Sequence, residues 1–249
     1  MKSNVLVTGG AGYVGAVLIP KLLDKGYNVK ILDLYYFSPS APVKAPSTDA
    51  IDLDVCSNVL IKGCYMSVSD DAVALKGGKG PWADEDTANG ENTNIIIEDC
   101  EFGFCHSALT CGSESIHNKN ILMRHCSVKE AARVLRFKMR PDTPQKYEFI
   151  TVENIKGQAL NFVYIKPWTQ FFDLKGRKDT PLSYAENIKL KNINLSCEIF
   201  FNVAITKHDR LSNFTFENLT IEAVNSRFDK SMIHGTIMKN VKVNNVLIE

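Results

Sequence analysis

The chain has 249 residues, a formal net charge of +1 and a hydrophobic content of 45%. This length allows one large domain or two small ones. The near-zero charge argues against nucleic acid as a partner, and no apolar run approaches the roughly 18 residues of a transmembrane helix. The N-terminus lacks the charged start, apolar run and cleavage site of a signal peptide, so we expect a cytoplasmic monomer.

The pattern of residues 1–38, the first segment, predicts a strand, a glycine-rich turn, a helix and a second strand. The two strands are expected at residues 4–7 and 28–34, with the helix over residues 13–25. Glycines at the start of a helix allow a phosphate to approach its N-terminus, and an acid after the second strand can bind ribose hydroxyls. The residues that would do this are Gly9, Gly12, Gly15 and Asp33.

Residues 1–38 resemble the opening of the extended short-chain dehydrogenases, the NAD-dependent sugar epimerases. The resemblance rests on the sequence TGGAGYVG at residues 8–15 and implies an NAD site. The segment is only a fragment of such a domain, however, and no Tyr-x-x-x-Lys pair occurs in the chain. We therefore expect no cofactor, with NAD as an alternative that depends on the glycine-rich turn alone.

The rest of the chain is built on a repeated motif, an asparagine followed by apolar residues at the second, fourth and seventh places. The copies recur at intervals of about 26–38 residues, and a second apolar strand follows several of them. Alternation predicts strands with one buried face, and units this short can bury it only by stacking. The fold predicted for residues 49–249 is a parallel β-helix. The copies begin at Asn58, Asn94, Asn120, Phe149, Asn187, Asn213 and Asn240.

The second strand of the first segment also fits this motif, through Val29, Ile31 and Leu34. We therefore predict that the Rossmann-like βαβ segment extends the parallel sheet and caps the N-terminal end of the β-helix, because an open sheet end needs a cover. The Pro- and Ser-rich residues 39–48 would form the junction. Two such unrelated parts indicate a chimera, made by natural recombination or by design.

Most of the cysteines are predicted to be packing residues, and Cys56, Cys105 and Cys197 are left unassigned. Three of them share an inward column of the repeat with Ile and Leu, where a thiol behaves as a small hydrophobe. We predict no metal site, although four neighbouring side chains allow a metal cluster as the alternative. The three column residues are Cys64, Cys100 and Cys126, and the alternative cluster is Cys100, Cys105, His106 and Cys111.

Alignment of the second strands brings acidic residues of consecutive coils together. Asp49 falls in the column of Asp71, and Asp70 falls in the column of His106. Adjacent parallel strands are about 4.8 Å apart, so these side chains are expected to share one patch. Carboxyls this close raise one another's pKa, which suits a general acid. Charged ladders on solvated turns are the alternative.

Cations are predicted beside these acids. Arg136 and Lys138 alternate on one strand and point the same way, and Lys76 occupies the column of Lys138. Acids for proton transfer beside cations that can hold an anion fit hydrolysis of an acidic sugar polymer.

Four short motifs resemble glycoside hydrolase family 28, the polygalacturonases. They are STDAID (47–52), SDD (69–71), CHS (105–107) and RFK (136–138), which resemble the family's Asn-Thr-Asp, Gly-Asp-Asp, Gly-His-Gly and Arg-Ile-Lys. The resemblance covers residues 46–249. It implies a right-handed, pectin-lyase-like parallel β-helix and inverting hydrolysis of α-linked galacturonate in pectic polysaccharide. Parent enzymes of this kind would be periplasmic or secreted.

The resemblance also implies a role for each residue of the patch. Asp70 would be the general acid, and His106 would support its protonation. Asp49 and Asp71 would activate the water, while Arg136 and Lys138 would bind the substrate carboxylate. An inverting pair is expected about 6.5–9.5 Å apart, which leaves room for the water.

Two insertions after Lys76 and Lys166 carry the two tryptophans, Trp82 and Trp168. We expect the insertions at the same corner of neighbouring coils. The two rings would either stack on sugars or pack their own loops.

Three functions therefore compete at this point. The four motifs favour a polygalacturonase-like hydrolase that acts on an acidic polysaccharide. The short β-helix and its abrupt junction favour an inactive structural scaffold, and the glycine-rich turn favours a nucleotide-binding, epimerase-like protein.

Overall fold

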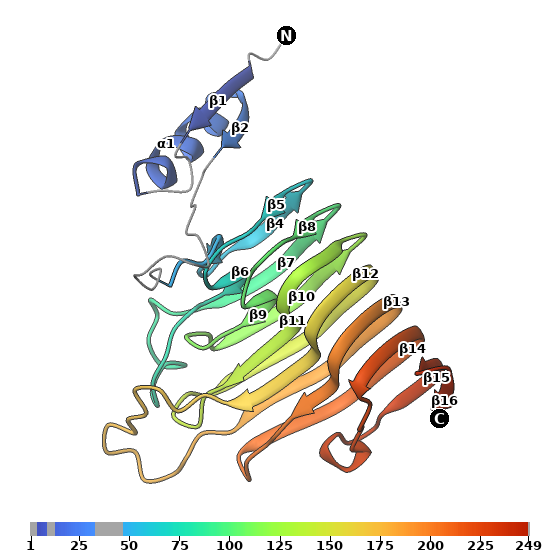
Figure 1. The fold of residues 1–249 in the computed structure, drawn as a ribbon. Helices are drawn as coiled ribbons and strands as arrows, with labels where there is room; N and C mark the ends of the chain where they lie inside the picture. The colour runs from blue at the N-terminus through green and yellow to red at the C-terminus, as the bar shows by residue number, and fades with distance from the viewer. Residues whose placement is uncertain (1–3, 9–12, 33–46, 249) are drawn as a thin grey trace, which may run out of the picture.

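The protein is mainly β, and its central feature is a stack of parallel coils (Figure 1). The computed structural model describes residues 4–8, 13–32 and 47–248. Fourteen strands form one sheet system in which every pairing is parallel except the last, between β15 and β16. These strands and one short 3-10 turn are β3 (Ile51–Leu53), β4 (Ser57–Lys62), β5 (Tyr65–Met66), β6 (Asp71–Leu75), β7 (Glu91–Glu98), β8 (Glu101–Phe102), β9 (Ser107–Cys111), β10 (His117–Arg124), β11 (Ser127–Met139), β12 (Gln145–Pro167), β13 (Ser183–Val203), β14 (Asp209–Asn225), η1 (Lys230–Met232), β15 (Ile237–Val243) and β16 (Val246–Ile248).

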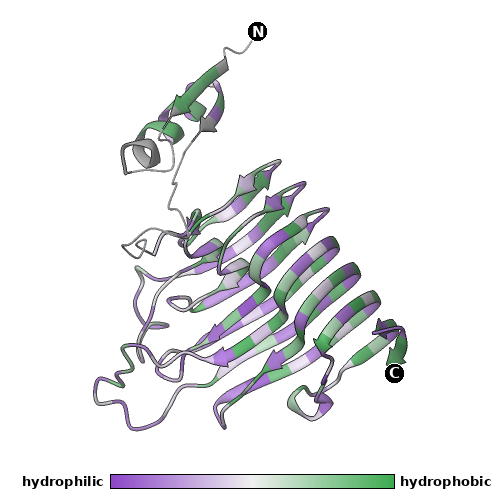
Figure 2. Cartoon of the chain, in the orientation of Figure 1, coloured by the Kyte–Doolittle hydropathy of each residue, from purple (hydrophilic) through white to green (hydrophobic). Residues whose placement is uncertain are grey.

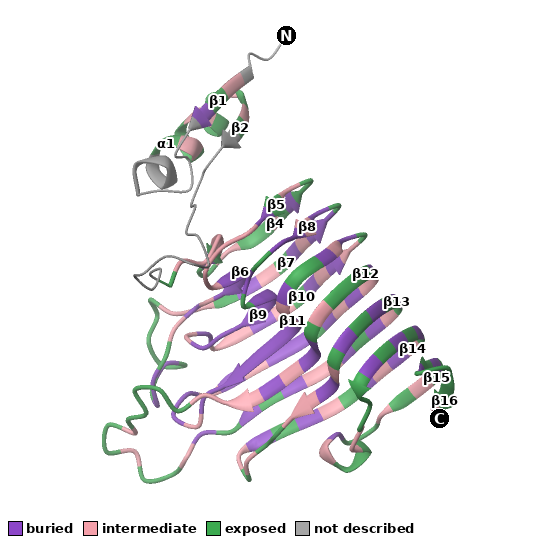
Figure 3. Ribbon diagram, in the orientation of Figure 1, coloured by how far each residue is buried: buried purple, intermediate pink, exposed green. Residues whose placement is uncertain are grey.

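The sequence repeat corresponds to the coils of a parallel β-helix, as predicted. Ile121 pairs in register with Ile95 on one side and with Ile150 on the other, and the same column continues through Ile188 and Phe214. These side chains are almost fully buried. Apolar and polar residues alternate along the strands (Figure 2), and buried positions line up from coil to coil (Figure 3). Each coil thus buries its apolar face against its neighbours.

The opening asparagines form ladders at a tight corner of the coils. Asn58, Asn94 and Asn120 have φ angles of 55–56°, in the left-handed region that asparagine tolerates better than most residues. The Asn94 side chain donates to that of Asn58, and Asn120 donates to Asn94. A second ladder runs through Asn154, Asn192, Asn218 and Asn240 at another corner.

The seventh copy of the motif lies out of the predicted register. Asn240 bonds to Asn218 of the second ladder, and Val241 pairs with Leu219 rather than with Phe214. Gly235, with φ +75°, takes the opening corner instead, next to the bridge between Ser212 and His234. Both corners need a left-handed residue followed by alternating apolar residues, so the motif by itself does not distinguish them.

The first segment forms the predicted βαβ unit, but it does not continue the sheet. β1 (Asn4–Thr8) and β2 (Asn28–Leu32) pair in parallel as a separate two-stranded sheet, and α1 (Tyr13–Asp24) contacts β2. In the described residues β4 pairs only with β7, so the predicted cap through residues 28–34 and 58–64 is wrong. Alternating apolar residues specify a strand with one buried face but not the strand it pairs with.

The predicted nucleotide residues lie mostly outside the described residues. This holds for Gly9, Gly12 and Asp33, whereas Gly15 lies in the first turn of α1. Across the described ranges, no helix has the length and apolar character needed to cross a membrane.

The cysteines that were assigned to inward columns pack as predicted. Cys100, Cys111 and Cys126 belong to the buried core, and Cys64 is half-buried against it. Cys105, for which no role was predicted, is also part of the core, and all seven cysteines are free thiols. Burial raises the pKa of Cys105 to about 12 and that of Cys197 to about 11, which keeps both thiols protonated. A protonated buried thiol serves as a packing group rather than as a metal ligand.

Phe149 interrupts the first asparagine ladder, and this generates a stability prediction. Its φ is 54°, its side chain is 46% exposed, and it lies between Asn120 and Asn187. A Phe149→Asn substitution would relieve the left-handed strain and supply an amide to both neighbours. We expect the free energy of unfolding to rise by about 1 kcal/mol, measured by chemical denaturation.

Phe149→Ala is the matched control, because it removes the exposed ring but keeps a Cβ at the left-handed position. It should give a smaller gain or none. A Phe149→Asn variant no more stable than Phe149→Ala would contradict the ladder argument.

Candidate active site

The predicted acidic patch lies on one parallel sheet formed by β3, β6, β9 and the second half of β11. Val73 pairs with Ile51 on one side and Leu109 on the other, and Leu109 pairs with Leu135. This register stacks residues that are 22–65 positions apart in the chain. The patch therefore follows directly from strand register.

Asp71 is the buried centre of the patch. One carboxylate oxygen lies 3.2 Å from a guanidinium nitrogen of Arg136, and the other lies 2.8 Å from Nζ of Lys138. All three side chains are more than nine-tenths buried. Burial would raise the pKa of the Asp71 carboxyl, but Lys138 and Arg136 outweigh burial and hold this pKa below its ordinary value.

The carboxylate of Asp70, the residue before Asp71, contacts His106. The two side chains are 2.9 Å apart, from Nδ1 of His106 to Oδ1 of Asp70. This hydrogen bond is the main cause that lowers the pKa of Asp70 to about 2. Asp70 is therefore ionised in the free protein, and any proton it delivers must reach it through its hydrogen-bond partners.

Asp49 differs from the other two carboxylates. One oxygen accepts the backbone N–H of Asp71 at 3.0 Å, and the other lies 3.4 Å from Nζ of Lys76. Burial, only partly opposed by Lys76, raises the pKa of Asp49 to about 6. Lys76 is shared with Asp52 and Glu114, at 3.5 and 3.9 Å. The pKa of Asp49 is thus raised, whereas the pKa values of Asp70 and Asp71 are lowered.

The three carboxylates also offer oxygens that lie within 4.8 Å of one another. Among the described residues they form the one group whose spacing could hold a cation. Lys76, Arg136 and Lys138 already supply the positive charges that such an ion would bring. The oxygens are also closer than the roughly 6.5–9.5 Å that is usual for inverting glycosidases.

The two tryptophans occupy different environments. The Trp168 ring lies over the guanidinium of Arg136 and the ammonium of Lys138, at 5.2 and 4.9 Å. The Trp82 ring instead lies 4.9 Å from the guanidinium of Arg177, which also donates to the carbonyl of Pro81. Trp168 therefore adjoins the patch, whereas Trp82 takes part in a contact between the two insertions.

The insertions after Lys76 and Lys166 begin at the same corner of the β-helix, as predicted. The two coils that carry them are not neighbours, however. The insertions follow β6 and β12, and β9 and β11 lie between these strands in the sheet. The Arg177–Pro81 bond nevertheless joins them. The buried Arg140–Asp142 pair anchors the second insertion through the Gln170 carbonyl and the Asp173 amide.

Tyr164 and Arg133 are site residues that sequence analysis missed. The Tyr164 ring has the Arg133 guanidinium at 4.4 Å and the Lys166 ammonium at 5.0 Å, and Tyr164 pairs in register with Arg136. Arg133 also donates to the His106 carbonyl. Extending the Arg136 column by one coil would have identified Tyr164 from the sequence, because the two residues are equivalent in consecutive repeats.

Comparison with known proteins agrees with this fold. The sequence model of the glycosyl hydrolases family 28 matches residues 23–167, which is more than half of the chain. The match begins inside α1, ahead of the boundary predicted near residue 46, and the predicted dehydrogenase-like origin of residues 1–38 has no support. The chain belongs to glycosyl hydrolases family 28.

Individual relatives match shorter stretches. A probable polygalacturonase of Vitis vinifera is 40% identical over 57 residues, 23% of this chain and 11% of that protein. A probable polygalacturonase of Arabidopsis thaliana is 28% identical over 101 residues, 40% of this chain and 20% of that protein. The chain thus matches about a tenth to a fifth of the length of these curated relatives.

A solved structure shares the fold over most of the chain. The hyperthermoactive exopolygalacturonase from Thermotoga maritima superposes with a TM-score of 0.64 over 85% of this chain and 46% of that one, at 17% sequence identity. The shared fold is the parallel β-helix.

The shifted pKa of Asp49 generates a prediction about stability and pH. Its folded-state pKa of about 6 lies above the ordinary aspartate value of 3.8, so ionisation of Asp49 destabilises the folded state as pH rises from 3.8 to 6. We expect Asp49→Asn to be more stable than the wild type above pH 6 and to lose that advantage below pH 3.8. Thermal unfolding measured across this range tests the prediction.

Asp70→Asn is the control, because its effect on stability at neutral pH is expected to have the opposite sign. The folded-state pKa of Asp70, about 2, lies below 3.8, so its ionised form stabilises the folded state above that value. This variant should be less stable than the wild type at neutral pH and approach it as pH falls toward 2. Parallel pH profiles for the two variants would contradict both assignments.

Proposed function

We propose that the chain hydrolyses α-linked galacturonate in pectic polysaccharide, as a polygalacturonase does. The observation that carries the proposal is the Asp70–His106 pair beside the Asp71–Arg136–Lys138 cluster. Family membership and the names of the matched relatives support the same substrate class. The proposed partner is therefore an acidic polysaccharide that binds to the surface of the β-helix. The proposed hand of the β-helix coil is right-handed.

In the proposed mechanism Asp70 protonates the glycosidic oxygen of the leaving group. Because Asp70 is ionised in the free protein, its proton arrives through the hydrogen bond with His106. Asp49 and Asp71 orient a water molecule, remove its proton and direct its oxygen to the anomeric carbon. Arg136 and Lys138 attract the carboxylate of the sugar, and Lys76 adds positive charge two coils away.

The proposed stereochemical outcome is inversion. Both oxygens of Asp71 are occupied by cations, and both oxygens of Asp49 are occupied by the Asp71 amide and Lys76. Each of these oxygens keeps a second lone pair that can accept a proton from water, and the raised pKa of Asp49 makes that carboxylate a stronger base than an ordinary aspartate. Water is therefore the proposed nucleophile despite the short spacing. Proton NMR of the first-formed product identifies its anomer, and a retained α-anomer would contradict the water mechanism.

The activity itself is tested by release of reducing ends from polygalacturonate. We expect activity in the wild type and a loss of at least about a hundredfold in Asp70→Asn, because general acid catalysis contributes that much or more. Asp99→Asn is a suitable control, since Asp99 lies at a distant corner with φ 56°, a conformation that asparagine tolerates. No release by the wild type would favour the inactive scaffold.

The environments of the two tryptophans predict different kinetic effects. Trp168→Ala removes the ring that packs on Arg136 and Lys138, so we expect KM for polygalacturonate to rise about two- to tenfold. Trp82→Ala disturbs only the contact between the insertions and should change KM less. Steady-state kinetics of the two variants measures the difference, and equal effects would assign Trp168 to loop packing alone.

A further inference from the structure

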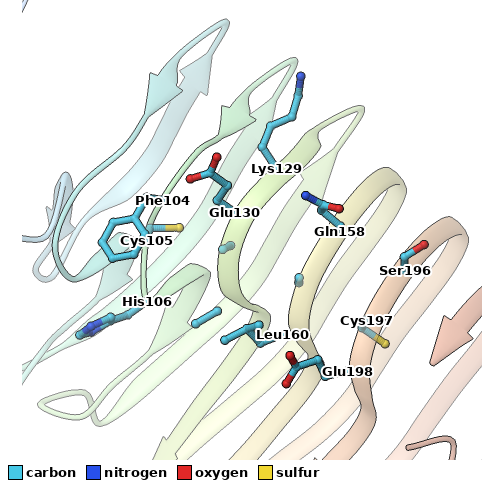
Figure 4. Close-up of a pocket in the computed structure, with 13 residues that line it drawn as sticks. Phe104, Cys105, His106, Lys129, Glu130, Gln158, Leu160, Ser196, Cys197 and Glu198 are labelled. Atoms are coloured by element: carbon cyan, nitrogen blue, oxygen red, sulfur yellow. The ribbon is translucent and has the colours of Figure 1, made fainter. Parts of the chain in front are cut away.

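A groove of about 520 Å³ continues from the catalytic patch along the stack of coils (Figure 4). It lies between β8 and β9 in one coil and at the equivalent positions within β11, β12 and β13. Four successive coils line it, from the coil of Phe104–His106 to the coil of Ser196–Glu198. His106 lines one end of the groove and is also the hydrogen-bond partner of Asp70, so the groove and the patch share a side chain.

Strand register makes the groove collinear with Asp70. Cys105 pairs with Ala131, Ala131 with Ala159, and Ala159 with Cys197. The residues that follow these four therefore form one column, which begins at Asp70 and continues through His106, Ala132, Leu160 and Glu198. At about 4.8 Å per coil, Leu160 lies roughly 10 Å beyond His106 along the stack. A polymer bound at the patch and extended along the coils would enter this groove.

The surface of the groove is largely apolar. Ala131, Ala132 and Ala159 line it, and the side chains of Phe104 and Leu160 are 52% and 48% exposed. Exposed aromatic and aliphatic side chains beside small residues suit the C–H face of a sugar or a small alkyl group.

Charge sets the groove apart from the patch. Glu130 and Glu198 both line the groove, are exposed and form no ion pair in the described part of the chain. Lys129 is the basic lining residue, and its ammonium lies 3.4 Å from the Glu101 carboxylate. The groove therefore carries more negative than positive charge. The patch contains the cations Lys76, Arg136 and Lys138, and each of them is paired with an aspartate. A free carboxylate in the groove would be repelled by Glu130 and Glu198.

We propose that this groove is a subsite for uncharged, methyl-esterified uronate units of the substrate chain. The inference rests on the proposed function and deepens it, since it assigns a substrate pattern to the same site. One free galacturonate unit occupies the patch, and esterified units of the same polymer extend over Ala132 and Leu160. Their methyl groups contact the apolar lining, while Glu130 and Glu198 disfavour units that carry a free carboxylate.

The kinetic experiment compares two forms of one polymer, fully de-esterified and partly methyl-esterified. The double variant Glu130→Gln/Glu198→Gln should raise kcat/KM on the de-esterified form about two- to fivefold and leave the partly esterified form unchanged. Leu160→Ala should lower kcat/KM on the esterified form only. Asp24→Asn, an exposed change on α1, is the matched charge control and should alter neither value.

The proposal would be overturned if the double glutamate variant changed kcat/KM equally on both polymers, or changed it on neither. A binding experiment separates this outcome from failure of the proposed function. Calorimetry with methyl-esterified and free oligogalacturonides is carried out in the Asp70→Asn background, where turnover is blocked. Tighter binding of the esterified oligomer, weakened by Leu160→Ala, supports the subsite even if the wild type hydrolyses neither polymer. Equal binding of the two oligomers, or no binding, overturns it.

Discussion

In-register stacking of parallel strands is the constraint on which the rest of this protein depends. Each residue lies about 4.8 Å from its equivalents in the coils on either side, so every position belongs to a column. Apolar columns such as Ile95–Ile121–Ile150 form the core. Columns at the corners must adopt left-handed backbone, and asparagine satisfies this with ladders of side-chain hydrogen bonds.

The same constraint creates the electrostatic character of the candidate active site. Stacking forces Asp49, Asp70 and Asp71 together, and an uncompensated cluster of carboxylates would be strongly unfavourable. The positive charges that offset these three carboxylates are distributed unevenly among them. Asp71 is neutralised by two buried cations and Asp70 is bonded to His106, whereas Asp49 has one shared lysine and a raised pKa. Different partners thus raise the pKa of Asp49 and lower those of Asp70 and Asp71, and acid–base catalysis uses carboxyls whose pKa values differ in this way.

Charge changes along the stack as well as across the patch. Cations surround Asp71, but the groove beyond His106 presents two glutamates and an apolar lining. Under the proposed function, a polymer that lies along the coils would meet both environments within a few sugar units. Such an arrangement would give a β-helix a physical means to recognise a pattern of charged and neutral units rather than a uniform chain.

The sequence by itself determined the coil repeat, the inward columns and the grouping of the acidic patch. Period-2 apolar patterns and the spacing of Asp49, Asp71, His106 and Arg136 contain this information, because register in a stacked coil follows from sequence position. Tertiary structure decided what periodicity does not encode. It showed that β2 pairs with β1 and not with β4, and that Asn240 belongs to the second corner. It also showed that the Arg177 guanidinium packs on the Trp82 ring and that the Arg136 guanidinium packs on the Trp168 ring. Choice of strand partner and contacts between insertions depend on long-range packing, which local patterns leave open.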